Sequence, residues 1–205
     1  MGLLRSVLLI ALALAIGAFL FFSDTEVTTD TPAVDEGVDT EPDVYGKDVT
    51  FRQLRPDGSL HYRLRASTIR QFDLDQLTRM AQPQLHLLNP EQPPWDIESN
   101  HGYIRKRSGP RGQPEDVVFL REEVELVQLH PENGLITMRS ESFYIYPDRQ
   151  YAETDQDVMI DTEVGRTKAA GLRANLENGV LSLSSAQHQR VHTIVLPEQF
   201  KNSDA

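Results

Sequence analysis

Cysteine is absent from all 205 residues of the chain. Without a thiol, the protein cannot form disulfides, thiolate metal sites or a cysteine nucleophile, and it cannot carry a lipid on an N-terminal cysteine. The motifs G-x-S-x-G, H-E-x-x-H, G-x-G-x-x-G and the phosphate-binding loop are also missing. These motifs mark the common hydrolases, proteases, dehydrogenases and nucleotide hydrolases. We therefore expect no enzyme activity, no catalytic residues and no cofactor.

Blocks of basic residues are missing as well. The net charge is −11, with 20 basic and 31 acidic residues in total. Only one basic residue, Arg5, but eight acidic ones lie before residue 47, so the rest of the chain is nearly balanced. Proteins that follow a nucleic-acid backbone need clustered Lys and Arg. We expect no nucleic-acid partner.

Clustered carboxylates and histidines are the remaining candidates for site chemistry. Residues 122–125 and 155–161 each contain three carboxylates that could act as general acid and base, but on strands this pattern is typical of a solvated face. The second cluster resembles the start of a calcium loop, yet Arg166 stands at the twelfth position, where such a loop requires Glu. His188 and His192 would lie about 13 Å apart on a strand, too far to share a metal ion. We expect no metal site.

A long apolar run is present near the N-terminus. Val7–Phe22 contains only Val, Leu, Ile, Ala, Gly and Phe, and two further leucines extend it to about twenty positions, roughly 30 Å of helix. Arg5 precedes the run and acidic residues follow it, which places the N-terminus in the cytoplasm. Because the run closes without a small-x-small cleavage site, we favour an uncleaved inner-membrane anchor over a signal peptide. The predicted anchor side chains are Leu4, Val7, Leu8, Leu9, Ile10, Leu12, Leu14, Ile16, Phe19, Leu20, Phe21 and Phe22.

The anchor is followed by an acidic stretch rich in Thr and Pro, residues 23–42. Such a composition buries too little apolar surface to offset the entropy of ordering, so it predicts a flexible spacer. We therefore divide the chain into an anchor at 1–22, a linker at 23–42, an exported domain at 43–198 and a disordered tail at 199–205.

The exported domain is predicted to be all-β. In Leu60–Ala66 apolar and polar residues alternate, which places them on opposite faces of a strand. Similar short runs are separated by turn-forming residues at 55–58, 131–134, 146–149 and 177–179. Residues 73–80 come closest to a helical pattern, and we interpret them as a turn followed by a strand. The pattern indicates a ladder of short strands.

A loose repeat underlies this ladder. Each copy begins with a small or polar residue, continues with a hydrophobic residue and a turn, and ends with the pattern V-x-hydrophobic. The copies begin near Ala66, Ser99, Ser140 and Ala170. The repeat suggests an elongated stack of hairpins that bury their apolar faces against one another.

The apolar faces of these strands allow two interpretations. They could form an ordinary closed core, or they could line an open groove in which a fatty acyl chain gains about 0.8 kcal/mol per buried methylene. The residues concerned are Phe51, Tyr62, Leu64, Met80, Leu85, Leu87, Val124, Leu126, Met138, Phe143, Ile145, Val158, Ile160, Leu172, Val191 and Val195.

The order of several short motifs resembles that of the LptC family of lipopolysaccharide export proteins. The motifs are the N-terminal anchor, Pro56-Asp57-Gly58 before Leu60-x-Tyr62-Arg63-Leu64-x-Ala66, Gln82-Pro83, Pro94-Trp95 and Ala170-Gly171-Leu172. The resemblance covers nearly the whole chain, with an insertion at 108–114 as the main departure.

This resemblance implies a twisted antiparallel β-jellyroll, open along one side, that takes up the acyl chains of lipid A from lipopolysaccharide. It also implies an inner-membrane ABC transporter that hydrolyses ATP, faced by Tyr45–Phe51, and the next periplasmic bridge protein, LptA, docked along Leu181–Leu196. The isolated domain could also form a homodimer. The implied docking residues are Tyr45, Val49, Phe51, Leu181, Leu183, Val191, Thr193 and Val195.

Two rival functions are compatible with the residues. A membrane-tethered scaffold with a closed core would bind proteins of the envelope but no lipid. A periplasmic carbohydrate-acting enzyme would use paired carboxylates and Trp95, and it requires two acids that converge on a cleft.

Overall fold

The computed structural model describes residues 41–73, 76–90, 92–109, 112–131, 134–186 and 190–195. All of them belong to one compact unit, Glu41–Ala205. The predicted anchor, most of the acidic linker and the C-terminal tail lie outside the described residues. Within the described ranges, no helix is both long and apolar enough to cross a membrane. The anchor therefore stays a prediction.

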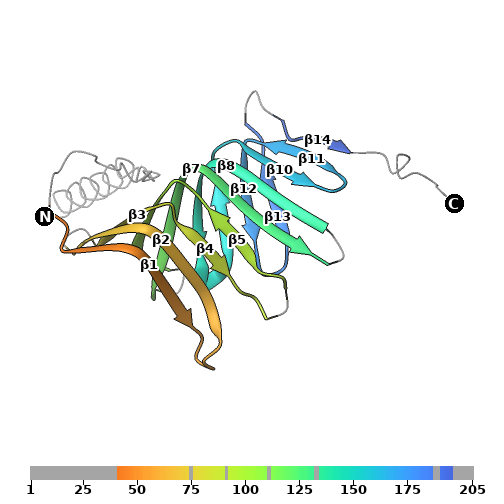
Figure 1. Ribbon diagram of the computed structural model, residues 1–205. Helices are drawn as coiled ribbons and strands as arrows, with labels where there is room; N and C mark the ends of the chain where they lie inside the picture. The colour runs from red at the N-terminus through yellow and green to blue at the C-terminus, as the bar shows by residue number, and fades with distance from the viewer. Residues whose placement is uncertain are drawn as a thin grey trace, which may run out of the picture. The chain divides into compact units, whose positions relative to one another are not determined.

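The described residues form fourteen strands, joined by antiparallel pairing into one sheet (Figure 1). This confirms the all-β prediction. The first seven strands are β1 Val44–Leu54, β2 Leu60–Phe72, β3 Leu77–Ala81, β4 Gln84–Leu87, β5 Trp95–Glu98, β6 His101–Ser108 and β7 Pro114–His130. The others are β8 Gly134–Tyr146, β9 Tyr151–Thr154, β10 Val158–Thr162, β11 Gly165–Ala169, β12 Gly171–Asn175, β13 Val180–Ser184 and β14 His192–Val195, with a 3₁₀ turn, η1, at Pro147–Arg149.

The sheet is folded into two facing halves that share four long strands, β1, β2, β7 and β8. Along β2, residues 62–65 pair with β4, whereas residues 68–72 pair with β3. The same division recurs in β7, which pairs with β6 and then β5, and in β8, which pairs with β10 and then β9. We call the half with β4, β5, β10, β11 and β14 half I, and the half with β3, β6, β9, β12 and β13 half II.

The fold line between the halves coincides with irregular backbone in the long strands and connections. Asp48 in β1, Gln82 between β3 and β4, and Glu122 and Glu123 in β7 all have positive φ values of 48° to 65°. The pairing of β7 with β8 also shifts register between Arg121 and Val124. A bulge bends a strand and strengthens its twist, so these residues turn the long strands from one half into the other.

The expected ladder of short strands is therefore only partly correct. β7 has 17 residues and β2 and β8 have 13 each. The alternating segment Leu60–Ala66 is only the first part of β2, and both β2 and β7 continue through bends at the fold line. Backbone pairing continues through them because β1 and β2, and β7 and β8, remain paired on both sides of the bend.

The predicted turns at 55–58, 146–149 and 177–179 lie between strands, whereas residues 132 and 133 of the turn predicted at 131–134 lie outside the described residues. Residues 55–58 close the β1–β2 hairpin, 146–149 connect β8 to β9, and 177–179 connect β12 to β13. Gly58 and Gly179 have φ values of +84° and +71°, which explains the choice of glycine there. Asp73 and Gln76 have turn geometry and β3 begins at Leu77, in agreement with the interpretation of residues 73–80 as a turn followed by a strand.

Candidate functional site between the two halves

Apolar side chains of both halves point into the space between them. In half I, pairing aligns Phe51, Leu64, Leu85, Ile97, Leu126, Met138 and Ile160 in one row across the strands. In half II, it aligns Ile69, Met80, Gly102, Leu120 and Phe143 in a second row. Because side chains alternate along a strand, each row occupies a single face. The two inner faces form the candidate site.

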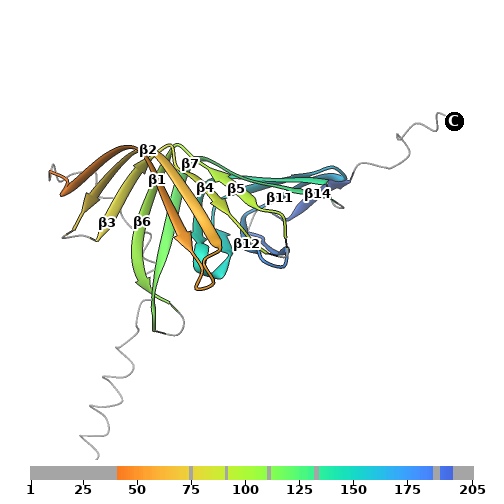
Figure 2. The ribbon, with the colours of Figure 1, turned by 60° about the horizontal axis from the view of Figure 1, so that its bottom comes forward.

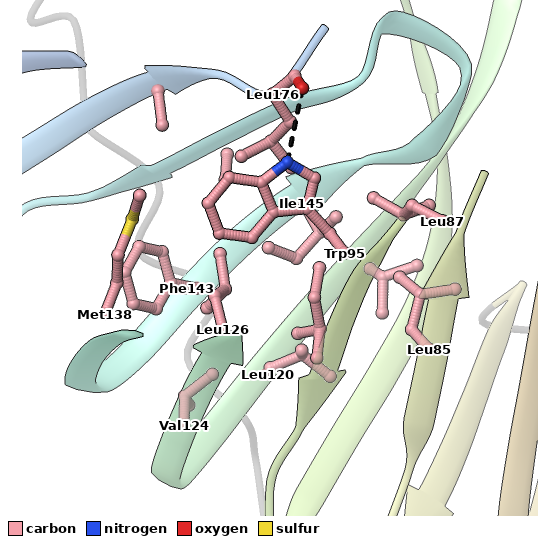
Figure 3. Packing of buried hydrophobic residues seen from close by; sticks show 14 of the residues in the cluster. Leu85, Leu87, Trp95, Leu120, Val124, Leu126, Met138, Phe143, Ile145 and Leu176 are labelled. Atoms are coloured by element: carbon pink, nitrogen blue, oxygen red, sulfur yellow. Dashed lines mark hydrogen bonds between the residues drawn. The ribbon is translucent and has the colours of Figure 1, made fainter. Parts of the chain in front are cut away.

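In the middle of this space the side chains are packed into a buried cluster. Phe143, Leu126 and Leu120 have no solvent exposure, and Met138 lies beside Phe143 (Figure 3). Most of the predicted acyl-lining residues belong to the cluster, namely Leu64, Met80, Leu85, Leu87, Val124, Leu126, Met138, Phe143, Ile145, Val158, Ile160 and Leu172, and Tyr62 packs against it. The closed-core interpretation therefore describes this middle region.

Three residues of the predicted set lie apart from the cluster. Phe51 is 41% exposed at the β1 end, whereas Val191 and Val195 are 40% and 66% exposed at the opposite end. Val195 pairs with Gly165 of β11, and its own strand, β14, is the outermost described strand of half I. The interior is thus filled in the middle, and the inner face is exposed at both ends.

At the β1 end the two halves part to form a cleft of about 600 Å³. Its apolar wall comes from Phe51, Tyr62 and Leu64 of half I and from Phe72 and Ile104 on the half II side. Leu64 also belongs to the buried cluster, so the cleft is continuous with the packed interior. This volume is within the range of small-molecule pockets, and the apolar wall suits an extended hydrocarbon chain, whereas the other residues that line the cleft are polar.

Polar groups surround the mouth of the cleft. Arg52 and Lys106 lie there together with Asp73 and Asp116, and Lys106 and Asp116 are opposite each other in the β6–β7 pairing. Burial raises the pKa of Tyr62 to about 12, so its phenol stays neutral inside the cleft at physiological pH. The arrangement is amphipathic, with an uncharged interior and a rim of both charge signs.

The lateral opening between the free margins of the two halves is bridged by hydrogen bonds. From half I, the Asn89 side-chain amide donates to Gln150 Oε1 at 3.0 Å and to the Glu177 carbonyl at 3.3 Å, and the Trp95 indole N–H donates to the Leu176 carbonyl at 3.2 Å (Figure 3). From half II, the Gln150 amide donates to the Leu88 carbonyl at 3.3 Å. The family resemblance implies a jellyroll that is open along one side, whereas these hydrogen bonds close the lateral opening at this point.

The predicted docking residues lie at the two ends of the sheet. Tyr45, Val49 and Phe51 are in β1, which pairs with β2 alone among the described strands. Leu181 and Leu183 are in β13, and Thr193 and Val195 are in β14, with Val191 just before it. Both C-terminal strands have one described neighbour each. Figures 1 and 2 show β1 and β14 far apart, so the sheet offers edges at opposite ends.

Several inner residues escape the sequence pattern. Val118 and Leu120 sit in the run VVFL, where apolar residues occupy both faces and hide the alternation. Trp95 and Ile97 are two residues apart, which is the spacing of one face of a strand. This spacing could have identified both as inner residues. Phe72 is the last residue of β2, and Ile104 lies in the middle of β6. Only the approach of β6 to β2 through β3 places them beside the cleft.

The charged clusters of the sequence are on outer surfaces or at the fold line. Arg139 bridges Glu125 and Asp161 at 2.7 and 3.0 Å, and Arg166 also binds Asp161. These hydrogen bonds, led by that of Arg166, hold the pKa of Asp161 below its usual value. Among the described residues, no three His, Cys, Asp or Glu side chains are grouped to hold a metal ion. His188 lies outside them.

Comparisons with known proteins agree with this architecture. The family model described as "Lipopolysaccharide-assembly, LptC-related" matches residues 8–191. Among solved structures, the chain is similar to LptH of Pseudomonas aeruginosa, the LptA-homologous periplasmic component of its lipopolysaccharide transport device. The TM-score is 0.51 with 9% sequence identity, over 66% of this chain and 95% of that one. At this identity the likeness shows a shared jellyroll fold. No match was found among curated proteins.

Proposed function

Because the chain belongs to the LptC-related family of lipopolysaccharide-assembly proteins, we propose that it takes part in lipopolysaccharide transport by holding acyl chains between the two halves of its sheet. The resemblance of its fold to an LptA-type jellyroll supports this assignment. The transported lipid would keep its phosphorylated sugars in water outside the jellyroll.

The observation that carries the proposal is the cleft at the β1 end. It joins an apolar wall, including Phe51 and Ile104, to the buried cluster, and it opens to solvent through a charged rim. Each methylene that moves from water into such a space gains about 0.8 kcal/mol. About ten buried methylenes in total would contribute about 8 kcal/mol, which corresponds to micromolar retention without any covalent step. We propose no enzymatic role and no cofactor.

The location and partners follow as further parts of the proposal. Residues 1–22 would anchor the chain in the inner membrane with the N-terminus in the cytoplasm, and the jellyroll would lie in the periplasm. The β1 edge would face an inner-membrane ABC transporter that supplies the energy. The β13 and β14 edges would receive an LptA-type bridge protein by strand addition, because unpaired strand edges offer ready main-chain hydrogen bonds.

Site-specific photo-crosslinking tests the lipid site. A photoreactive phenylalanine analogue is placed at Phe51 or Ile104, which line the cleft, and at the adjacent Thr50 or Arg105, which are exposed. Each pair shares a strand and differs in face. After irradiation with lipopolysaccharide, we expect adducts at 51 and 104 at least tenfold more abundant than at 50 and 105. Equal labelling within each pair would favour the rival scaffold with a closed core.

Membrane fractionation tests the location. The full chain should stay in the inner-membrane fraction after alkaline extraction, and a version beginning at residue 41 behind a cleavable export signal should be released as periplasmic protein. Release of the full chain under the same treatment would contradict the anchor.

A further inference from the structure

The four hydrogen bonds across the lateral opening form a distinct structural unit, which we call the clasp. It consists of the side chains of Asn89, Trp95 and Gln150 and of the carbonyl groups of Leu88, Leu176 and Glu177. Its half I members belong to the β4–β5 connection and the first residue of β5. Its half II members belong to the turns that follow β8 and β12. The partners are 61 to 88 residues apart in sequence.

The clasp lies between the two exposed ends of the inner faces. On one side is the cleft with Phe51 and Ile104. On the other is the inner face of β14, where Thr193 bonds to Thr167 at 3.0 Å and both remain outside the buried cluster. Trp95 and Leu176 at the clasp are 3% and 1% exposed, so the interior is sealed there.

The chemistry of the clasp suits reversible opening. All its members are neutral groups, and neutral hydrogen bonds contribute little individually because water replaces them when they break. Its polar side chains at positions 89 and 150 are half-buried and belong to connections, so the margins can part while the pairing of the strands is retained. Its indole remains packed in the cluster from the half I side (Figure 3).

We propose that the clasp is a latch that opens for each lipid molecule as its acyl chains move from the β1 end to the β14 end. This inference rests on the proposed function. An amphiphile whose tails are between the halves and whose head group is in water needs an uninterrupted slit between the margins. Burying the charged head group instead would cost far more than breaking the four hydrogen bonds. The closed clasp interrupts that slit, so passage requires it to open.

Crosslinking across the clasp tests the latch, and the absence of cysteine makes the thiol chemistry specific. The full chain carries Asn89→Cys and Glu177→Cys, joined by a short bis-methanethiosulfonate reagent that dithiothreitol removes. The control carries Glu177→Cys and Val180→Cys, two exposed positions on the same turn of half II. A photoreactive residue is placed at Ile104 or at Thr193, one position at a time. Adducts with purified lipopolysaccharide then report lipid at the entry end (104) or at the exit end (193).

We expect the locked chain to retain its adduct at 104 and to lose at least nine-tenths of its adduct at 193, with recovery after reduction and no loss in the control. Equal labelling at 193 in locked and reduced chains would overturn the latch. Absence of adducts at both positions in the reduced chain would instead overturn the proposed function.

A second variant tests the latch from the opposite direction. Trp95→Phe keeps an aromatic ring in the cluster but removes the indole N–H that binds the Leu176 carbonyl. We expect faster appearance of the adduct at 193, by about threefold or more, with no change at 104. An unchanged or slower rate at 193 would contradict the latch, because the clasp would then not limit passage.

Discussion

Replacing Phe143 with alanine tests whether the middle of the jellyroll is a packed core. Phe143 has no solvent exposure, and it lies between Met138 and Leu126 in the buried cluster (Figure 3). Truncation of a buried phenylalanine removes its transfer free energy and leaves a cavity, at a cost of about 3–5 kcal/mol. For a domain of this size, each kcal/mol lowers the melting temperature by about 2–4 °C, so we expect a decrease of about 6–20 °C.

Urea unfolding followed by tryptophan fluorescence is a suitable assay, because Trp95 is the only tryptophan and is 3% exposed in the folded protein. The matched control is Glu141→Ala, an exposed position in the same strand, which should change the free energy of unfolding by less than about 0.5 kcal/mol. Lipopolysaccharide should restore part of the loss if acyl chains enter the new cavity. A cost below about 1 kcal/mol for Phe143→Ala would refute the packed middle and indicate an already open trough.

Three further predictions concern other parts of the jellyroll. Gly165→Ala should detach β14, because the added Cβ would lie 2.2 Å from the Ile194 carbonyl oxygen, and faster amide exchange in β14 measures this effect. Desolvation by burial lowers the pKa of His61 below its usual 6.5, so the unfolded chain binds the proton more readily. Stability should then fall as the pH decreases below about 6.5, and His61→Asn should flatten this dependence in urea titrations at pH 5.5 and 7.5. Asn175→Ala removes the side-chain acceptor of the Glu177 N–H in the β12–β13 turn and should cost about 1 kcal/mol in the same titrations, whereas no measurable cost would refute its role.

Local pattern was sufficient to predict an all-β domain and most of its inner residues, but not the length of the long strands β2, β7 and β8. Alternation in Leu60–Ala66 depends only on backbone geometry, which places alternate side chains on opposite faces in any sheet. The turn at Gly58 could also be predicted locally, because glycine adopts the positive φ value that this turn requires. The loose repeat had a structural basis too, since Ala66, Ser99 and Ala170 lie at or beside the fold line between the halves.

The cleft and the clasp depended on contacts that no local pattern contains. Phe51 and Ile104 line one cleft only because two halves of a bent sheet face each other, and Asn89 meets Glu177 across 88 residues of sequence. The sequence by itself determined the all-β class, the turns and the identity of the inner faces, because these depend on the period of single strands. Only the tertiary structure decided where the two inner faces close and where they part, because packing between strands that are distant in sequence sets the separation of the faces.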